Sequence, residues 1–308
     1  FCGCWWWKGE LGKVKEIIEY PTQSLIQIIK DDKEILIPIH EDIVKNVDRE
    51  GKKICIKAPS GLIDMYLGIW YMDCRPFFFK KFGMFHHRST MRIGTDAVLF
   101  AQWVSVKSSD DVLDIGTGSG IIPMILSQKG AGSVDAVELD KDSFEEAKQN
   151  FSISVWNEKL NVFNIDVRNF ADETDKKYDL IVSNPPYYAS DVKPIKEKKV
   201  MARHVSTLSF KDLLISAKKM MKNEARFAVV LPFYESRLFI KEAENHGFYL
   251  QKEFLIAPIE SKDPNRVNMQ FVFDKIENIE SELFTIRNLD YSYTDQYKDF
   301  LKDYYLDF

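Results

Sequence analysis

The pattern of hydrophobic and polar positions differs between two parts of this chain. In the first 67 residues, short runs rich in Ile, Val and Leu are separated by turn-forming pairs such as Tyr20-Pro21 and Glu50-Gly51. The pattern predicts strands at 12–19, 24–29, 34–39 and 53–57. Strands of this length and spacing favour a small β-barrel or rolled sheet.

From residue 93 onward, apolar strand patterns alternate with amphipathic helix patterns. Strands are predicted at 112–115, 133–139, 160–165, 178–183, 225–231, 248–257 and 267–274, and helices at 119–128, 141–153, 210–221 and 235–246. Such alternation predicts an α/β fold, a doubly wound, mostly parallel sheet with helices on both faces. Ligands of these sheets bind at the carboxyl ends of the strands, where the motifs below fall.

Composition and charge narrow the classes of protein. With 308 residues, 45% of them hydrophobic and 29% charged, the chain is not expected to be disordered. A net charge of −5 excludes a wholly basic nucleic-acid binder. Charge is nevertheless segregated, since residues 74–95 hold five Lys or Arg and no acid, and 193–226 hold ten against three acids. These stretches permit a phosphate-contacting surface, and solvated helix faces are the alternative.

The cysteines and the apolar runs bear on location. Cys2, Cys4, Cys55 and Cys74 lack the paired spacing of a zinc site, and His86-His87 has no nearby carboxylate partner, so no metal is expected. Scattered thiols without a secretory leader indicate a reduced, cytoplasmic protein. The longest uncharged run, residues 115–128, is too short to span a bilayer, and no membrane association is expected.

A glycine-rich motif follows the strand predicted at 112–115 and opens the next helix. Its residues are Asp114, Gly116, Gly118 and Gly120. Glu138 ends the following strand, where a carboxylate can accept both ribose hydroxyls of an adenosyl group. A dinucleotide fingerprint would need glycine in place of Ile121. The motif instead fits S-adenosylmethionine, which has no pyrophosphate, with Asp114 facing its sulfonium or amino group.

Two further motifs lie at strand ends. Asp166 follows the strand predicted at 160–165 and can accept a hydrogen bond from the cofactor's adenine amino group, or it can cap a helix. Asn184-Pro185-Pro186-Tyr187 follows the strand at 178–183. The Asn184 side chain and the Pro185 carbonyl can accept the two N–H bonds of a substrate amine and aim its lone pair at a methyl group. The prolines stiffen the loop, and Tyr187 can stack on a planar base.

Together these motifs resemble class I S-adenosylmethionine-dependent methyltransferases that act on amino groups. The segment from Met91 to Trp103, with Phe82 and Arg88 before it, is similar to the bacterial tRNA1(Val) (adenine-N6)-methyltransferase family, as are the motif at Asn184 and Tyr291-Ser292-Tyr293-Thr294. The likeness covers about residues 75–308. It implies methylation of the adenine on the 3′ side of the anticodon, with the anticodon stem-loop of tRNA as partner. By this resemblance the cofactor-binding residues are Arg92, Thr95, Asp114, Gly116, Gly118, Gly120, Glu138 and Asp166, and the residues that hold the target adenine are Asn184, Pro185, Pro186 and Tyr187.

The first 67 residues resemble the C-terminal barrel of the ribosome maturation factor RimM. The matching stretches are residues 9–14, 34–39 and 58–66. The expected domains are therefore a barrel at 1–67, a linker at 68–80 and a methyltransferase domain at 81–308. The barrel implies a ribosomal protein or the 30S subunit as a second partner.

Other functions share the same motifs. Glutamine methyltransferases acting on release factors carry Asn-Pro-Pro-Tyr, but usually with a helical N-terminal domain. DNA adenine methyltransferases carry it with a separate recognition domain, for which this chain has little room. A third alternative is a ribosome-binding or 30S maturation module to which a methyltransferase is attached.

Overall fold

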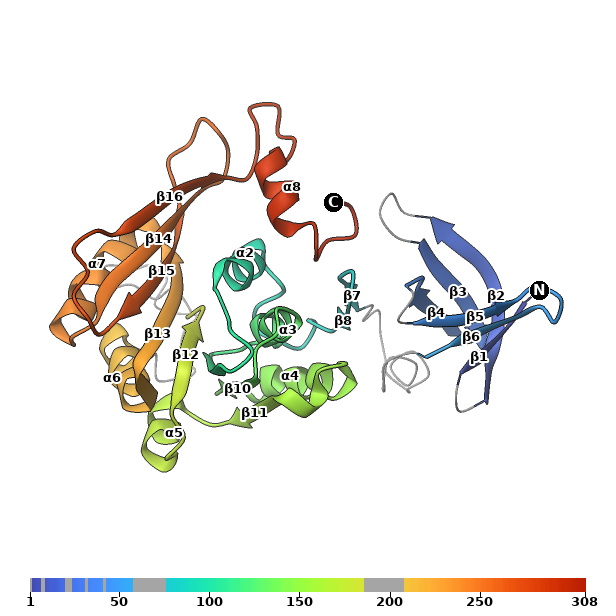
Figure 1. Ribbon diagram of the computed structural model, residues 1–308, viewed down its shortest axis with the longest axis horizontal. Coiled ribbons are helices and arrows are strands. Elements are labelled where there is room, and N and C mark those ends of the chain that lie inside the picture. Colours follow the sequence, from blue (N-terminus) through green and yellow to red (C-terminus); the bar gives the residue numbers. More distant parts are fainter. Residues whose placement is uncertain are drawn as a thin grey trace, which may run out of the picture.

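The computed structural model describes residues 2–6, 9–19, 24–30, 33–40, 43–57, 76–185 and 208–308, and these form two units. Figure 1 shows them side by side, with the blue strands of the first unit apart from the larger second unit. Pro186 and Tyr187 lie outside the described residues, as does the 193–207 part of the basic stretch at 193–226.

The first unit is a six-stranded sheet. Its strands are β1 (Cys2–Trp6), β2 (Gly9–Glu19), β3 (Ser24–Lys30), β4 (Lys33–Pro38), β5 (Val44–Asp48) and β6 (Lys53–Ile56). They lie in the order β4-β3-β2-β1-β6-β5, and only the β1–β6 pair is parallel. A small core forms between them from Leu11, Ile26, Ile28, Ile35, Ile37, Ile54 and Ile56. The four strands expected from the sequence are present, and β1 and β5 are additional.

The second unit is built on an eight-stranded sheet. Its strands are β9 (Asp111–Ile115), β10 (Ser133–Glu138), β11 (Leu160–Asn164), β12 (Tyr178–Ser183), β13 (Met221–Pro232), β14 (Tyr249–Ala257), β15 (Arg266–Val272) and β16 (Glu280–Thr285). The order is β11-β10-β9-β12-β13-β15-β14-β16, with β15 antiparallel to both of its neighbours and every other pair parallel. The predicted mostly parallel sheet is confirmed.

Helices cover both faces of this sheet (Figure 1). They are α2 (Thr95–Trp103), α3 (Ile121–Gln128), α4 (Lys141–Ile153), α5 (Val167–Glu173), α6 (Phe210–Met220), α7 (Phe233–Asn245) and α8 (Asp295–Leu301), with a short 3-10 turn at Asn157–Lys159. Residues of α2, α3, α4 and α8 share one hydrophobic core, and residues of α5, α6 and α7 share the other. This two-layer burial confirms the doubly wound fold class. Among the described residues, no helix is long and apolar enough to cross a membrane.

A small hairpin joins the two units. Its strands are β7 (Phe77–Phe78) and β8 (Gly83–Met84). Phe79 is fully buried in the core of the second unit and Phe77 packs against it, whereas Phe78 packs against the core of the first unit. Successive residues of a strand point to opposite sides, so this one strand contacts both units. The core of the second unit therefore begins at Phe77.

Candidate functional site

The glycine-rich loop leaves the sheet at the end of β9. Gly116 and Gly120 adopt φ angles of +76° and +90°, a left-handed conformation that side chains with a Cβ rarely adopt. A Cβ on Gly120 would also lie 2.5 Å from the ring of Phe151, whereas nothing stands within 4 Å of one on Gly116. The Gly116 N–H donates to the carbonyl of Val137 over 2.9 Å, which ties the loop to β10. The loop is thus held open on the side where a ligand would lie.

Glu138 closes the loop from the end of β10. One carboxylate oxygen accepts from the Gly118 N–H at 2.8 Å and the other from the Asp140 N–H at 2.9 Å. Burial raises the pKa of Glu138, and these two hydrogen bonds lower it in part. Each oxygen keeps a further lone pair that can accept a ligand hydroxyl.

Asp114 lies on β9, two residues before Gly116, and is completely buried, with 0% of its surface exposed. Neither carboxylate oxygen has a hydrogen-bond partner in the described part of the chain. Burial raises its pKa to about 7, the Thr117 hydroxyl opposes this rise, and the charge of Glu138 adds to it. A buried, unpartnered carboxylate is costly, and a cationic ligand would offset that cost. The residues present therefore fit S-adenosylmethionine, which carries a sulfonium and an ammonium group.

Asp166 caps α5. Its side chain accepts from the Arg168 backbone N–H at 2.9 Å and forms an ion pair with the Arg168 guanidinium at 2.5 Å. The hydrogen bond with the Arg168 side chain is the main reason that its pKa is lowered. The helix-cap interpretation is therefore present in the structure, and a role for Asp166 at the cofactor's adenine stays a prediction.

Asn184 and Pro185 follow β12 at the point where the order of the strands in the sheet reverses. Strand β9 has β10 on one side and β12 on the other, and Ser183 pairs with Ile115. Adjacent strands are about 4.8 Å apart, so Asn184 begins its loop beside Gly116. Pro185 is buried and Asn184 half-buried. The Ser183 hydroxyl donates to the Ile115 carbonyl at 2.9 Å and fixes the two strand ends to each other.

A segment at residues 85–90, named here the strap, lies against the face of α4 that carries Glu146 and Asn150. The buried carboxylate of Glu146 accepts from three successive backbone N–H groups, those of His87, Arg88 and Ser89, at 2.7 to 2.9 Å. Asn150 accepts from the N–H of Phe85 and donates to its carbonyl. These bonds hold the strap rigidly in place.

The strap also reaches the glycine-rich loop. The Asn150 amide donates to the Ser119 carbonyl at 2.8 Å, so one side chain bonds both segments. A Cβ on Gly118 would lie 3.4 Å from the Ser89 hydroxyl. Arg92 and Thr95, which follow the strap, are exposed. They follow Ser89 within six residues, and their role at the cofactor stays a prediction.

Glu146 and Asn150 were not predicted from the sequence. A signal was present, because Ser143, Glu146, Ala147 and Asn150 follow the spacing of one helix face, and all four are buried. Polar residues on the inward face of an amphipathic helix must find partners. The partners in the strap lie more than 50 positions earlier in the chain, which no local pattern reveals.

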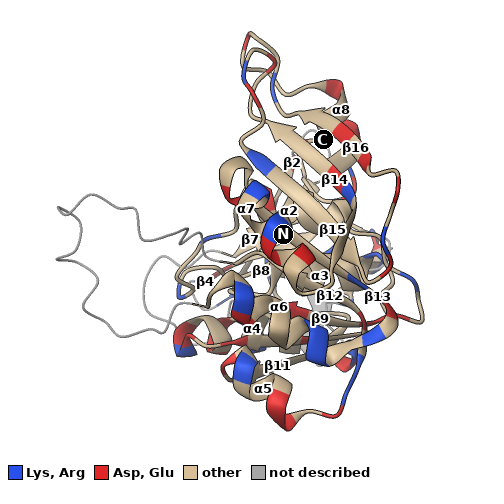
Figure 2. Cartoon of the chain, turned by 90° about the vertical axis from the view of Figure 1, so that its left-hand side faces the viewer, with Lys and Arg blue, Asp and Glu red and all other residues tan. Residues whose placement is uncertain are grey.

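Other candidate residues have structural roles. The Nδ1 of His86 accepts from the Ile93 N–H at 3.3 Å, and burial lowers the pKa of His86, so its ring is neutral. Phe79 lies in the core, and the ring of Trp103 packs beside Phe254. Figure 2 shows Lys and Arg positions interspersed with Asp and Glu positions along the ribbon.

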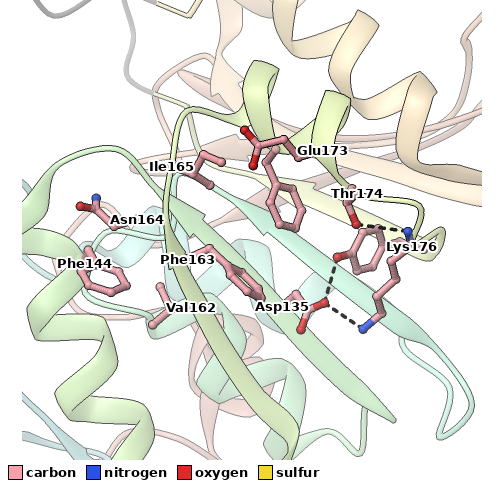
Figure 3. Close-up of a pocket in the computed structure, with 11 residues that line it drawn as sticks. Asp135, Phe144, Val162, Phe163, Asn164, Ile165, Glu173, Thr174 and Lys176 are labelled. Carbon is pink, nitrogen blue, oxygen red and sulfur yellow. Dashed lines mark hydrogen bonds and ion pairs between the residues drawn. The ribbon is translucent and has the colours of Figure 1, made fainter.

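A cleft of about 640 Å³ runs along the edge strand β11. Figure 3 shows its polar end, where Asp135 accepts from the Tyr178 hydroxyl at 2.9 Å and the Lys176 ammonium at 2.8 Å. Asn161 donates to the other Asp135 oxygen at 3.0 Å. Both oxygens of Asp135 accept hydrogen bonds from within this cluster, and the cluster links β10 to β12. We therefore assign it a structural role.

Comparisons with known proteins agree with this geometry. Residues 77–231 match the family described as Methyltransferase small domain, and residues 1–62 match the RimM PRC barrel domain. A protein of Trichodesmium erythraeum named tRNA1(Val) (adenine(37)-N6)-methyltransferase is 34% identical over 238 residues, covering 76% of this chain and 99% of the relative. A protein of the same name from Parabacteroides distasonis is 32% identical over 232 residues, covering 75% and 98%.

A solved structure supports the fold. The structure described as a predicted O-methyltransferase from Agrobacterium tumefaciens aligns with a TM-score of 0.52 and 18% identity, covering 68% of this chain and 96% of that one. At this identity the likeness shows the fold alone, and it confirms the class I methyltransferase architecture of the second unit.

Proposed function

Because the chain belongs to the family of tRNA1(Val) (adenine(37)-N6)-methyltransferases, we propose that it methylates the exocyclic N6 of adenine 37, beside the anticodon of tRNA1(Val). S-adenosylmethionine is the methyl donor. The observation that carries the proposal is the strand register, which puts the loop of Asn184 beside Gly116, above the unpartnered carboxylate of Asp114. A loop that can accept hydrogen bonds from an amine and a carboxylate that can bind a cation thus lie at the same edge of the sheet.

The proposed chemistry starts from a poor nucleophile. The lone pair of the adenine amino group is delocalised into the ring. The Asn184 side-chain oxygen and the Pro185 carbonyl would accept its two N–H bonds, turning the nitrogen toward tetrahedral geometry. When bound, S-adenosylmethionine supplies an electrophilic methyl group. The new N–C bond forms as the S–C bond breaks, and the nitrogen then releases a proton to water.

The cofactor-binding roles are proposed on the same basis. Asp114 would face the positive end of the cofactor, and Glu138 the ribose hydroxyls. Gly116, Gly118 and Gly120 would let the backbone approach closely. Tyr187 would stack on the flipped adenine, and Arg92 and Thr95 would close the site from the strap side. Extrusion of the base is cheap because an anticodon-loop base is already unpaired.

The first unit suggests a second partner. Since residues 1–62 match the RimM PRC barrel domain, we propose that this unit binds a ribosomal protein or the 30S subunit. Substrates of this kind place the protein in the cytoplasm. A release-factor methyltransferase is less well supported, because the described part of the first unit is a β-sheet and not the helical domain of those enzymes.

The test is methylation of unmodified tRNA by an Asn184→Ala variant. Protein and labelled S-adenosylmethionine are incubated with tRNA that lacks the modification, and nucleoside mass spectrometry identifies the product. We expect N6-methyladenosine from the wild type and a loss of about 100-fold or more from the variant, the scale for removing one preorganised polar contact.

Asn223→Ala serves as the matched control. Asn223 is exposed near the amino end of β13, at the opposite edge of the sheet. Sinefungin affinity should stay within about twofold of wild type in both variants. Near-wild-type turnover of Asn184→Ala would exclude the amine-orienting role, and absence of N6-methyladenosine in the wild-type reaction would exclude the function.

A further inference from the structure

Helix α7 carries an aromatic and basic face that the proposed chemistry does not use. Phe233, Tyr234 and Leu238 are 41%, 69% and 37% exposed, although all three are large and apolar. Arg237 and Lys241 complete this face, because residues four apart lie one above the other on a helix. We name these five residues the α7 face.

The α7 face is opposite the side of the helix that holds the core. Ser236, Phe239 and Ala243 are the buried residues of α7. At about 3.6 residues per turn these three point to one side, and the α7 face points to the other. Phe233 and Tyr234 are therefore exposed on the side of α7 that does not pack against the sheet.

The α7 face lies next to the proposed target-base loop. Strand β13 runs parallel to β12, with Ser183 paired to Val229, and it ends at Pro232. The helix therefore starts from the neighbouring strand, only about three strand residues beyond the level of Ser183. With strands about 4.8 Å apart and a rise of roughly 3.3 Å per residue, the first turn of α7 forms a rim beside Asn184.

This rim is rigid. The Phe233 N–H donates to the Asn265 carbonyl at 3.1 Å, which ties the start of α7 to the turn between β14 and β15. The Arg237 guanidinium stands 4.8 Å from the centre of the Phe233 ring and bonds to Glu253 at 2.7 Å. Phe233 and Arg237 thus brace each other, while Tyr234 projects beside them into solvent.

Exposed aromatic rings next to cations are the typical surface for single-stranded nucleic acid, since bases stack on the rings and phosphates meet the charges. We propose that the α7 face binds the anticodon loop, with a base adjacent to the target adenine stacked on Tyr234 and the loop backbone beside Lys241. This inference rests on the proposed function. Three apolar side chains are too small an area for a stable protein partner, whereas one stacked base needs no more.

The test uses the full-length protein and an unmodified anticodon stem-loop RNA with 2-aminopurine next to the target adenine. Stacking quenches 2-aminopurine fluorescence. We expect quenching with wild type and with Tyr234→Phe, which keeps the ring, and little quenching with Tyr234→Ala. The alanine variant should bind the RNA roughly 10-fold or more weakly, within the range for loss of one stacking contact.

Methylation kinetics separate binding from chemistry. Tyr234→Ala should raise KM for tRNA about 10-fold with kcat within about twofold of wild type, because Tyr234 does not touch the reacting atoms. Lys241→Glu should also raise this KM. Leu283→Ala, which removes an equally exposed apolar side chain from β16, should change neither constant.

The outcomes separate the two proposals. If the wild type methylates tRNA while Tyr234→Ala matches it in quenching, affinity and KM, the α7 face is not an RNA surface and the proposed function still stands. If the wild type neither binds nor methylates the stem-loop, both are wrong. Sinefungin affinity and the thermal unfolding temperature, expected to be unchanged by Tyr234→Ala, show that the variant is folded.

Discussion

At the scale of single residues, Asp114 is the most informative group in the site. The ordinary pKa of an aspartate side chain is 3.8, and burial raises that of Asp114 to about 7. The folded state therefore binds more protons than the unfolded state between about pH 4 and pH 7. The contribution of Asp114 to the unfolding free energy should fall as pH rises through this window, by on the order of 4 kcal/mol at about 1.36 kcal/mol per pKa unit.

Replacement of Asp114 by asparagine should remove this dependence. We expect denaturant unfolding to show Asp114→Asn close to wild type near pH 4 and more stable than wild type above pH 7. Because a cationic ligand favours the ionised carboxylate, wild-type sinefungin affinity should rise with pH up to about 7, and this rise should be lost in the variant.

Asp111, at the start of the same strand, is the matched control. Its pKa is lowered, mainly by a hydrogen bond from the Ser133 hydroxyl, so its contribution to stability is present above its unfolded pKa and is lost as pH falls. Asp111→Asn should thus be destabilised at neutral pH. Wild-type and Asp114→Asn stabilities that run parallel from pH 4 to pH 8 would contradict the role assigned to Asp114.

The sequence predicted candidate site residues from local motifs at strand ends. Gly116 and Asn184 directly follow strands and Glu138 ends one, and parallel strands bring such ends to one edge. It did not identify Glu146, because the burial of that carboxylate is produced by the strap, 57 positions earlier in the chain. Local chemistry could be read from the sequence, whereas the supporting contacts depend on the tertiary fold.

At the scale of elements, helix α4 was predicted with its observed bounds. Asp140 caps it, accepting from the Ser143 N–H at 2.9 Å, and its inward positions follow a helical period. Helix α2 was missed because Ala97 to Ala101 are buried all round, which leaves no amphipathic stripe. Strand β16 was missed because four of its six residues are exposed, and it forms only by pairing with β14.

Three backbone N–H groups of the strap bond to the Glu146 carboxylate of α4, so Glu146→Gln is the sharpest test of how the strap is held. Glutamine keeps one acceptor oxygen and turns an NH₂ group toward backbone N–H donors. We expect hydrogen exchange to accelerate at the amides of His87, Arg88 and Ser89, and global stability to fall by about 1–3 kcal/mol. Because the strap lies within the basic stretch 74–95 that is expected to contact phosphates, KM for tRNA should rise several-fold.

Glu145→Gln is the neighbouring control, since Glu145 is exposed on the same helix. It should leave both exchange and KM unchanged. If the three strap amides kept wild-type protection in Glu146→Gln, the strap would be held by contacts other than this carboxylate.

At the scale of the whole molecule, the change from a strand pattern to alternating strand and helix patterns predicted two units. Two family matches fall on these two parts of the chain. The position of the joint could not be read from the pattern. Phe77, Phe78 and Phe79 form one apolar run, yet Phe79 is in one core and Phe78 packs against the other. Which side each ring takes is decided by the pleat of β7, a tertiary feature.

This division predicts that methylation does not need the first unit. The relatives correspond over nearly their whole length to about three quarters of this chain, so the remaining part is absent from them. A truncated chain of residues 76–308 keeps Phe77 and Phe79 with their core, and loses the packing of Phe78 against the first unit. We expect its kcat/KM for tRNA to stay within about threefold of the full chain.

The same pair of proteins tests the second partner. Sedimentation with purified 30S subunits should retain the full chain and release the truncated one, because the match to the RimM barrel lies entirely in the missing part. Cutting instead after Phe79 should unfold the second unit, since a large core side chain is removed, at a cost of about 3–5 kcal/mol. A chain of residues 76–308 that is folded by circular dichroism but methylates no tRNA would show that the barrel presents the substrate to the methyltransferase, and the two units would then form one tRNA-binding surface.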